Sequence, residues 1–177
     1  EEGVPAAMIE NIGKNKGMPV GPLAVTDEVS LTLGLHVMES DPRLKDHPEM
    51  MRNYNIEKLM VEEHGRGGKK AGAGYYEYPE DGTKFLWQGL SEHFPLAADQ
   101  PTQEDVTKRL IYRQALEVVR CMEEGVVTSP EDADIGAIFG WGFAPWTGGP
   151  ISMIDTLGID VFVNECDALY KKHGPAF

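Results

Sequence analysis

The chain has 177 residues, enough for one full-sized hydrophobic core or two small ones, and 41% hydrophobic with 25% charged residues is typical of globular rather than disordered proteins. With 16 basic against 29 acidic residues, the formal net charge is -13. Such a surface repels a phosphate backbone, which argues against nucleic acid as a partner.

Two single cysteines, Cys121 and Cys166, and the lack of a signal-like apolar start indicate a reduced, cytoplasmic protein. The twenty uncharged residues from Ile135 to Ile154 are long enough to span a membrane. Five glycines and two prolines among them argue against a continuous helix, so we predict a buried, turning segment and no transmembrane segment. The histidines show no metal-ligand spacing, and we predict no metal site.

In chain order, the first predicted element is a short helix in the segment PAAMIENIGKN, whose apolar residues share one face. A longer helix is expected from Leu23 to Ser40, because apolar residues recur there at helical spacing. After a polar connection with two prolines, a third helix is expected over residues 50–64.

A glycine-rich basic loop, HGRGGKKAGAG, follows at residues 64–74. It leads into GYYEYPEDGTKFLW, where aromatic and β-branched residues flank a PEDG turn, so we predict a small β-hairpin near residues 74–88. Two prolines and little periodicity mark residues 89–101 as a linker.

The second half opens with a capping-box pattern at Thr102, which starts a long amphipathic helix that ends before Gly125. Ser129 and the proline after it are start signals for a shorter helix. A last helix is predicted over residues 159–173, where a basic last turn suits the helix dipole.

An internal repeat relates the two halves. EEGV at residues 1–4 returns at residues 123–126, and GPxxxxD occurs at residues 21–27 and again at residues 149–155. The offset is 122 residues at the first motif and 128 at the second, so the second copy carries six extra residues where FGWGFAPWTG lies. Such an insertion is tolerated at a turn.

We therefore predict a mainly α fold of two related helical repeats packed on each other, because each repeat is too small for a generous core of its own. The first repeat spans residues 1–79, the hairpin end and a linker span 80–101, and the second repeat spans 102–177. The second repeat has a long helix before its EEGV, and the first repeat does not. This difference predicts a piece of a longer protein with an uncovered apolar groove in the first repeat, which favours self-association.

Three stretches carry a resemblance to a known family: EEGVPAAMIENIGKNKGMPVGPLAVTDEV, GRGGKKAGAGYYEY and RQALEVVRCMEEGVVTSPEDADIGAIFGWGFAPWTGGPISMID. Together they resemble the C-terminal region of the 3-hydroxyacyl-CoA dehydrogenases. The multifunctional β-oxidation enzymes, which join an enoyl-CoA hydratase domain to the dehydrogenase, are the most similar group. The resemblance covers nearly the whole chain, and GWGFAPWTGGP is its most specific part.

The resemblance implies a parent enzyme of fatty acid metabolism that oxidises 3-hydroxyacyl-CoA to 3-ketoacyl-CoA with NAD, using an N-terminal domain for catalysis and for NAD binding. No GxGxxG follows a predicted strand here, so we expect no catalytic residue, no cofactor site and no activity of this chain alone. The implied partners are the missing dehydrogenase and hydratase domains, the acyl-CoA substrate and a thiolase subunit. The implied role is to complete the substrate cleft and to hold the assembly together.

The family also has an Asn-Arg pair on the helix that precedes the first EEGV. At the matching place of the second repeat stand Lys108 and Arg109. Lysine cannot supply an amide, so the resemblance implies that the second repeat is a structural duplicate without that site. It packs, by this reading, on the first repeat as a stand-in for a partner subunit.

Three sets of candidate contact residues remain open. The resemblance places one turn near the acyl end of the cleft, although a tight turn between helices explains the same residues: Met18, Pro19, Gly21 and Pro22. The basic loop could contact CoA phosphates or the missing domain, or could be a solvated loop: Arg66, Lys69 and Lys70. The aromatic insertion is expected to supply core and repeat-interface anchors: Trp141, Phe143 and Trp146.

Asp27 and Asp155 occupy equivalent places in the repeat, which favours hydrogen bonds to backbone over paired acid–base catalysis. A different class of function is also open for the chain. A stand-alone helical module could bind a partner protein through the apolar surface around Trp141, Phe143 and Trp146.

Overall fold

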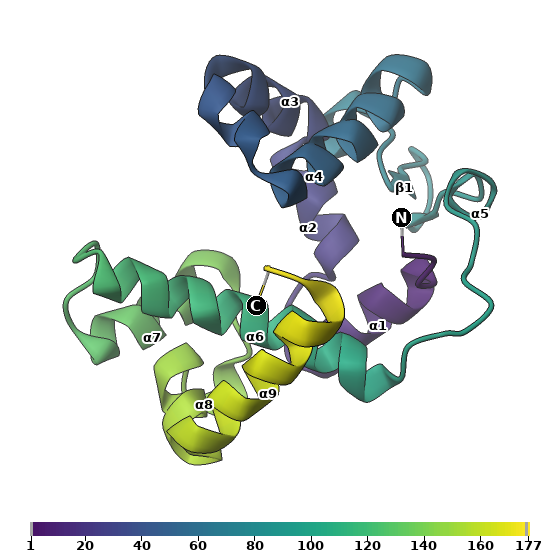
Figure 1. Ribbon diagram of the computed structural model, residues 1–177. Coiled ribbons are helices and arrows are strands. Elements are labelled where there is room, and N and C mark those ends of the chain that lie inside the picture. Colours follow the sequence, from purple (N-terminus) through teal and green to yellow (C-terminus); the bar gives the residue numbers. More distant parts are fainter. Residues whose placement is uncertain (1, 176) are drawn as a thin grey trace. The chain divides into compact units, whose positions relative to one another are not determined.

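The computed structural model describes residues 2–175 and 177. The chain divides into two compact units. Unit 1 comprises the segment up to Glu10 together with Gly21–Gln100, and unit 2 comprises Asn11–Val20 together with Pro101–Phe177. Helix α1 (Ala6–Asn15) begins in unit 1 and ends in unit 2 (Figure 1).

Unit 1 is built mainly from short helices. Their bounds are α2 (Pro22–Val29), α3 (Leu31–Ser40), the 3-10 helix η1 (Pro42–Asp46), α4 (Pro48–Lys58), the π-helical turn η2 (Leu59–Glu63), the 3-10 helix η3 (Lys69–Ala71) and α5 (Leu90–His93). A proline opens three of these helices, where its missing N–H costs nothing. The helix predicted over residues 50–64 is confirmed as α4 and η2.

The single helix expected from Leu23 to Ser40 is wrong, because Ser30 divides it into α2 and α3. Ser30 has φ 92° and ψ 122°, and among the described residues no other non-glycine has positive φ. Its hydroxyl donates to the carbonyl oxygen of Gly67 at 3.1 Å, and the Leu31 N–H donates to the same oxygen at 3.1 Å. The apolar spacing continues across the break, so it does not reveal this tertiary contact.

The predicted hairpin is confirmed. Strand β1 (Tyr76–Glu77) pairs antiparallel with β2 (Phe85–Leu86), so that Tyr76 lies opposite Leu86. The linker predicted after it contains the one-turn helix α5. Leu31, Met60 and Leu90 form the buried centre of unit 1, and partly buried apolar side chains from α4, η2, the hairpin and α5 surround it.

Unit 2 contains α6 (Gln103–Glu123), α7 (Pro130–Trp141), the 3-10 helix η4 (Pro145–Thr147), α8 (Pro150–Leu157) and α9 (Ile159–His173). The predicted caps are confirmed: the Thr102 hydroxyl accepts the Asp105 N–H at 3.1 Å, and the Ser129 hydroxyl accepts the Asp132 N–H at 3.2 Å. The uncharged segment 135–154 is broken into α7, η4 and α8. None of the helices in the described part of the chain is long and apolar enough to cross a membrane.

One core cluster joins the helices of unit 2. Its buried members are Ile111, Tyr112, Ala115, Ala137, Phe143, Ala144, Ile154, Phe162, Cys166 and Leu169. Cys121 and Cys166 are both free thiols, the first partly buried and the second buried. The chain is thus mainly α with one small antiparallel sheet, as predicted.

The repeat is visible in the backbone of both units. Helices α2 and α8 each have eight residues, and each begins with a proline that follows a glycine. A single residue with positive φ ends each of them, Ser30 in unit 1 and Gly158 in unit 2, and the next helix begins directly after it. The two GPxxxxD motifs therefore start the same local structure.

Candidate functional site

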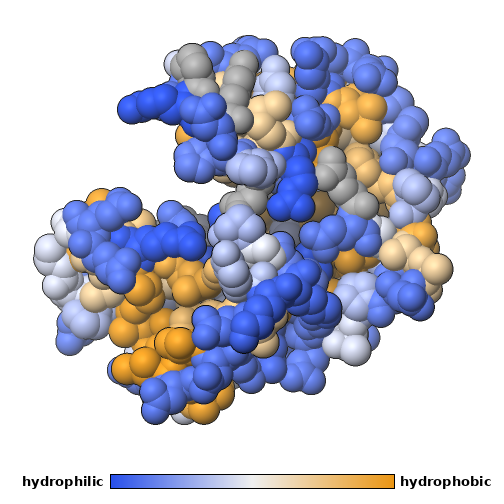
Figure 2. All heavy atoms as spheres, viewed as in Figure 1, coloured by the Kyte–Doolittle hydropathy of each residue, from blue (hydrophilic) through white to orange (hydrophobic). Residues whose placement is uncertain are grey.

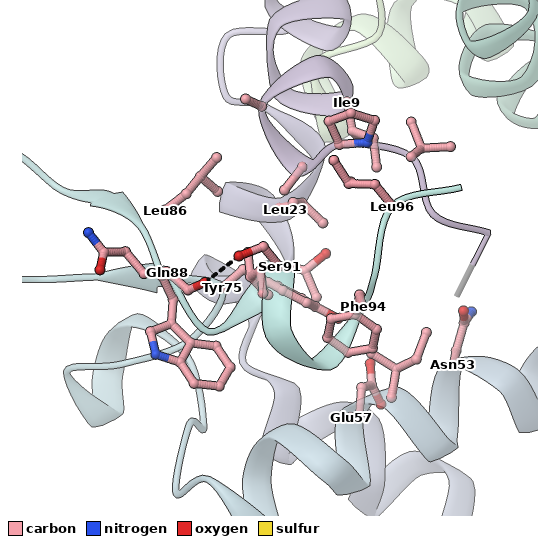
Figure 3. A pocket seen from close by; sticks show the side chains of 18 residues that line it. Ile9, Leu23, Asn53, Glu57, Tyr75, Leu86, Gln88, Ser91, Phe94 and Leu96 are labelled. Atoms are coloured by element: carbon pink, nitrogen blue, oxygen red, sulfur yellow. Dashed lines mark hydrogen bonds between the residues drawn. The ribbon is translucent and has the colours of Figure 1, made fainter. Parts of the chain in front are cut away.

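An apolar cavity of about 640 Å³ opens in unit 1 (Figure 3). The start of α1, one face of α2, helix α4, the hairpin and α5 contribute its walls. Figure 3 shows Ile9 at one end and Glu57 at the other, with Leu23, Leu96 and Phe94 between them. A cavity of this size lined mainly by apolar side chains suits an apolar occupant.

Glu57 is the acidic residue of this lining. Burial raises the pKa of its carboxyl above the ordinary value. Gly34 of α3 makes room for the carboxylate, since a Cβ built there would lie 2.2 Å from Glu57 Oε2. Because a partly desolvated carboxylate is stabilised by a donor or a cation, the cavity favours an apolar occupant that carries such a group.

Glu10 fixes the start of α2, at the turn that the sequence identified as a candidate contact. Its buried carboxylate accepts the backbone N–H groups of Leu23 and Ala24, at 2.5 and 3.3 Å, and the hydroxyl of Tyr76 at 2.6 Å. Gly21 is required here, since a Cβ would lie 2.1 Å from Glu10 Oε2. The carboxylate thus neutralises free N–H groups at a helix N-terminus.

Asp134 does the same for α8 in unit 2. Its carboxylate accepts the backbone N–H groups of Ile151 at 2.7 Å and Ser152 at 3.1 Å, and the Ser152 hydroxyl at 2.6 Å. A Cβ on Gly149 would lie 2.4 Å from the Asp134 carboxylate. The GP pair of each repeat is therefore explained: glycine leaves space for a carboxylate, and proline opens the helix that the carboxylate caps.

Asp27 anchors the hairpin to α2. It is fully buried, and its carboxylate accepts the N–H groups of Tyr75 at 2.7 Å and Tyr76 at 2.9 Å and the hydroxyl of Tyr78 at 2.9 Å. Burial raises the Asp27 pKa, while these hydrogen bonds oppose the rise. The predicted hydrogen bonding to backbone is confirmed for Asp27, whereas its counterpart Asp155 is exposed.

Arg66 points into unit 1. Its guanidinium donates to the carbonyl oxygens of Gly74 at 2.6 Å and Tyr76 at 3.1 Å, pairs with Glu77 at 2.9 Å, and lies 4.2 Å from the ring centre of Trp87. The side chain is buried, so these contacts assign Arg66 a structural role in joining loop and hairpin. Among the three basic candidates, Lys69 and Lys70 are exposed, and Lys69 pairs with Glu28 at 2.7 Å.

The turn that contains Met18 and Pro19 packs within unit 2. The indole N–H of Trp146 donates to the carbonyl oxygen of Lys16 at 2.7 Å. A Cβ on Gly142 would lie 2.8 Å from the Pro19 ring. Met18 is half-buried and Pro19 is exposed. The aromatic insertion of the second sequence repeat therefore holds a turn that belongs, in sequence, to the first repeat.

The three aromatic candidates have different environments. Phe143 is fully buried in the core of unit 2, so it is a core anchor. Trp141 is 49% exposed and donates its indole N–H to Gln114 at 3.1 Å, and Trp146 is 71% exposed. Figure 2 shows apolar residues gathered over the part of unit 2 that carries α7 and α8. Exposed apolar side chains of α7 there include Ile135 and Phe139.

Lys108 is held by acids of unit 2. Its ammonium pairs with Glu165 at 2.8 Å and with Glu104 at 2.9 Å, and these hydrogen bonds raise its pKa. The Tyr112 hydroxyl donates to the other oxygen of Glu165. This network ties α6 to α9, which is a structural role for Lys108.

The sequence did not single out Glu10, Asp134, Glu57 or the cavity. Glu10 and Asp134 lie on helices whose acidic residues look like ordinary surface residues. One signal was available: each GP pair predicts a helix start without a Ser, Thr or Asp cap of its own, so a distant acceptor could have been sought.

Comparison with known proteins matches residues 1–78 to the family described as 3-hydroxyacyl-CoA dehydrogenase, C-terminal domain. The fatty acid oxidation complex subunit alpha of Shewanella amazonensis is 34% identical over 168 residues, which cover 91% of this chain and 23% of that protein. The proteins of the same name from Shewanella baltica and Vibrio parahaemolyticus are 34% and 30% identical and also cover 91% of this chain. The chain spans about a quarter of the length of these relatives.

The resemblance seen in the sequence is thereby confirmed. The matched residues include the first GPxxxxD motif, the basic loop and strand β1. They include Glu10, Asp27 and Arg66, whose charged side chains are buried in unit 1. Residues 1–78 thus match the C-terminal domain of the 3-hydroxyacyl-CoA dehydrogenases, and 91% of the chain is similar to a part of the fatty acid oxidation complex alpha subunits.

Proposed function

We propose that the chain completes the substrate cleft of a multifunctional 3-hydroxyacyl-CoA dehydrogenase of fatty acid β-oxidation and helps to hold that enzyme together. The match of residues 1–78 to the C-terminal domain carries this proposal. The parent reaction is the oxidation of a 3-hydroxyacyl-CoA to a 3-ketoacyl-CoA, with hydride transfer to NAD. An N-terminal dehydrogenase domain supplies the catalytic groups and binds NAD.

The role of this chain in the reaction is to position the acyl end of the substrate. Gly21 and Pro22 start α2 at a point that the buried Glu10 carboxylate holds, and the preceding turn is held by Trp146. A turn fixed at both ends suits a cleft wall, because it loses little conformational entropy when a substrate binds. Lys70 is exposed, and Lys69 is exposed although paired with Glu28, so this loop offers cations to an anionic group of the substrate or to the neighbouring domain.

The partners are the dehydrogenase and hydratase domains of the parent enzyme and a thiolase subunit. The relatives are named as subunits of a fatty acid oxidation complex, which supports an assembly of this kind. The exposed apolar side chains of Phe139 and Trp146 in unit 2, 85% and 71% exposed, support a protein contact on this unit.

Reconstitution tests the proposal. The remainder of the Shewanella amazonensis relative, made without the region that matches this chain, is mixed with the purified chain, a 3-hydroxyacyl-CoA and NAD, and NADH formation is followed by absorbance. We expect no turnover by the chain alone and at least about tenfold faster turnover when it is added to the remainder, since positioning a substrate contributes several kcal/mol. Turnover by the chain alone, or no stimulation, would contradict the proposal.

A second candidate is a helical module that binds a partner protein and takes no part in the reaction. The exposure of Phe139, Trp141 and Trp146 favours it, although the buried Phe143 cannot belong to such a surface. Changing Phe139 alone to Ser separates the two functions, because Trp146 also holds the turn of the proposed cleft wall. If the chain completes the cleft, this variant should stimulate NADH formation in the reconstituted reaction as strongly as the natural chain does. If the chain is only a binding module, neither protein should stimulate the reaction, and the variant should differ from the natural chain only in weaker binding of the partner protein.

A further inference from the structure

We propose that the turn of the hairpin is a site of backbone modification, at which Asp81 isomerises to isoaspartate through the nitrogen of Gly82. The product carries a free main-chain carboxylate. This is the group that protein carboxyl methyltransferases methylate with S-adenosylmethionine. Neither residue lines the cavity of unit 1, and the modification does not depend on the proposed reaction.

The sequence places the right pair of residues in this turn. Asp81 is the one aspartate of the sequence that precedes a glycine, and no asparagine precedes one. Isomerisation begins when the main-chain nitrogen of the next residue attacks the side-chain carboxyl carbon of the aspartate. Because glycine has no Cβ, its nitrogen is the least hindered and its main chain has the widest choice of dihedral angles.

The fold leaves both residues free to react. Asp81 and Gly82 are exposed and lie between β1 and β2, outside the paired strand residues. In the part of the chain that the structure describes, neither residue takes part in a hydrogen bond or an ion pair. A Cβ built on Gly82 would meet the Pro79 ring at 3.1 Å and nothing else within 4 Å. The carboxyl group and the nitrogen can therefore approach each other without breaking another contact.

Other aspartates of the chain are protected by their contacts. Asp27 is fully buried, and its carboxylate accepts the N–H group of Tyr75 at 2.7 Å. The carboxylate of Asp134 accepts the N–H group of Ile151 at 2.7 Å. A carboxylate that is held by such donors must give them up before it can react with its own main chain. Asp81 has no such contact to lose.

The atoms of the reaction balance with water as the only co-reactant. The Gly82 nitrogen forms a bond to Cγ of Asp81, and the amide proton and the carboxyl OH leave as water, so that a cyclic succinimide results. A water molecule then opens the ring. Attack at Cγ restores aspartate, whereas attack at the main-chain carbonyl carbon leaves the chain linked through Cγ. The isoaspartate has the same mass as aspartate, and its main chain is longer by one carbon atom.

The longer main chain should loosen the hairpin. Its strands have two residues each, and the register of such a hairpin depends on the geometry of its turn. The hydroxyl of Tyr78, next to the turn, donates to the buried carboxylate of Asp27 at 2.9 Å. The Trp87 N–H donates to the carbonyl oxygen of Tyr75 at 2.9 Å and reports the pairing of the hairpin.

Incubation of the purified chain at neutral pH and physiological temperature tests the proposal. Isoaspartate is measured by methyl transfer from labelled S-adenosylmethionine with an isoaspartyl methyltransferase, and its position by fragmentation mass spectrometry. We expect it at residue 81, at a rate within about threefold of that in the chain unfolded in urea, because the folded turn offers no protection. In the isomerised fraction, hydrogen exchange of the Trp87 N–H should be about tenfold faster.

Matched variants separate the glycine from the turn as a whole. Gly82→Ala should form isoaspartate at least about fivefold more slowly, because a Cβ hinders the attacking nitrogen. Gly82 does not have positive φ, so alanine fits the folded turn. Thr83→Ala changes an exposed neighbour in the same turn and should leave the rate unchanged. Asp99, which is exposed and precedes Gln100, is the control within the chain.

Two results would overturn the proposal. If isoaspartate forms at residue 81 in urea but not in the folded chain, the folded turn protects the site. If it accumulates equally at Asp99, or if Gly82→Ala reacts as fast as the natural chain, the Asp81–Gly82 pair is not what determines the reaction.

Discussion

Ser30 joins α2 to α3 in unit 1, and Gly158 joins α8 to α9 in unit 2, with nearly the same backbone conformation. Ser30 has φ 92° and ψ 122°, and Gly158 has φ 93° and ψ 129°. Only one of them is a glycine, the residue that adopts positive φ without strain. The Ser30 hydroxyl donates to the carbonyl oxygen of Gly67, a contact that offsets part of the strain. The unit that lacks such a contact carries glycine.

The first prediction concerns this junction. Gly158→Ser should lower the free energy of unfolding by about 1–3 kcal/mol, because serine there would adopt a strained backbone without a partner like Gly67. Urea unfolding measures the change. Gly136→Ala is the control, since Gly136 lies within α7 with nothing near a Cβ, and it should be neutral or stabilising by about 0.5–1 kcal/mol. If both variants lose the same free energy of unfolding, backbone strain at residue 158 is not the cause.

The second prediction couples Glu10 to Gly21. Gly21 has φ -67°, which alanine adopts freely, so Gly21→Ala is destabilising only through the clash of its Cβ with the Glu10 carboxylate. We expect a loss of about 2–3 kcal/mol, the cost of displacing a buried carboxylate from its donors. In a Glu10→Ala background the same change should cost under about 0.5 kcal/mol. Additive losses in a double-mutant cycle would show that the clash is not the cause.

The third prediction separates Arg66 from its basic neighbour. Arg66→Met should destabilise unit 1 by about 3 kcal/mol, because it removes the donors of two carbonyl oxygens and leaves Glu77 without its ion pair. Lys70→Met, at an exposed position of the same loop, should change stability by less than about 0.5 kcal/mol. Thermal unfolding followed by circular dichroism compares the two variants. If Arg66→Met is as stable as the natural chain, Arg66 has no structural role and is again a candidate for anion binding.

The fourth prediction is a pH dependence at Glu57. Its folded-state pKa is raised, so its contribution to stability is present below the ordinary value of 4.5 and is lost as the pH rises through the folded-state pKa. Glu57→Gln should therefore be more stable than the natural chain at neutral pH, and the difference should shrink on acidification. Urea midpoints over the acid range measure it.

The control for this change is Glu39→Gln, at an exposed position of α3. It should alter the urea midpoint little at any pH. A Glu57→Gln protein that is less stable than the natural chain at neutral pH would mean that the carboxylate has a stabilising partner in the folded state.

The caps at Thr102 and Ser129 could be predicted because each joins two residues that are three apart in the chain, and such short-range patterns can be recognised in the sequence. The Glu10 carboxylate caps α2 over a separation of 13 residues, and Asp134 caps α8 over 17. No local pattern encodes these contacts. The break at Ser30 was missed for the same reason, because its partner Gly67 lies 37 residues away.

For the candidate site, sequence reasoning singled out a turn and a loop as candidate contacts, and it did not predict the contacts that each side chain makes. It could not predict that Arg66 is buried while Lys70 is exposed, because both lie in one glycine-rich loop. The difference comes from the contacts of Arg66 with the hairpin, which are tertiary. The sequence predicted an apolar groove in the first repeat, and unit 1 has an apolar cavity, but the self-association expected with that groove stays a prediction. Whether the turn at Met18–Pro22 contacts a substrate stays a prediction.

The Glu10–Gly21 and Asp134–Gly149 pairs also constrain how such a sequence can change over generations. A side chain in place of either glycine collides with the acid, and loss of the acid leaves a helix start without its acceptor. Each partner is therefore held in place by the other, because a change at either position of the pair lowers the free energy of unfolding. The two repeats differ in the length of the acid, Glu in one and Asp in the other, while a glycine lies against the acid in both.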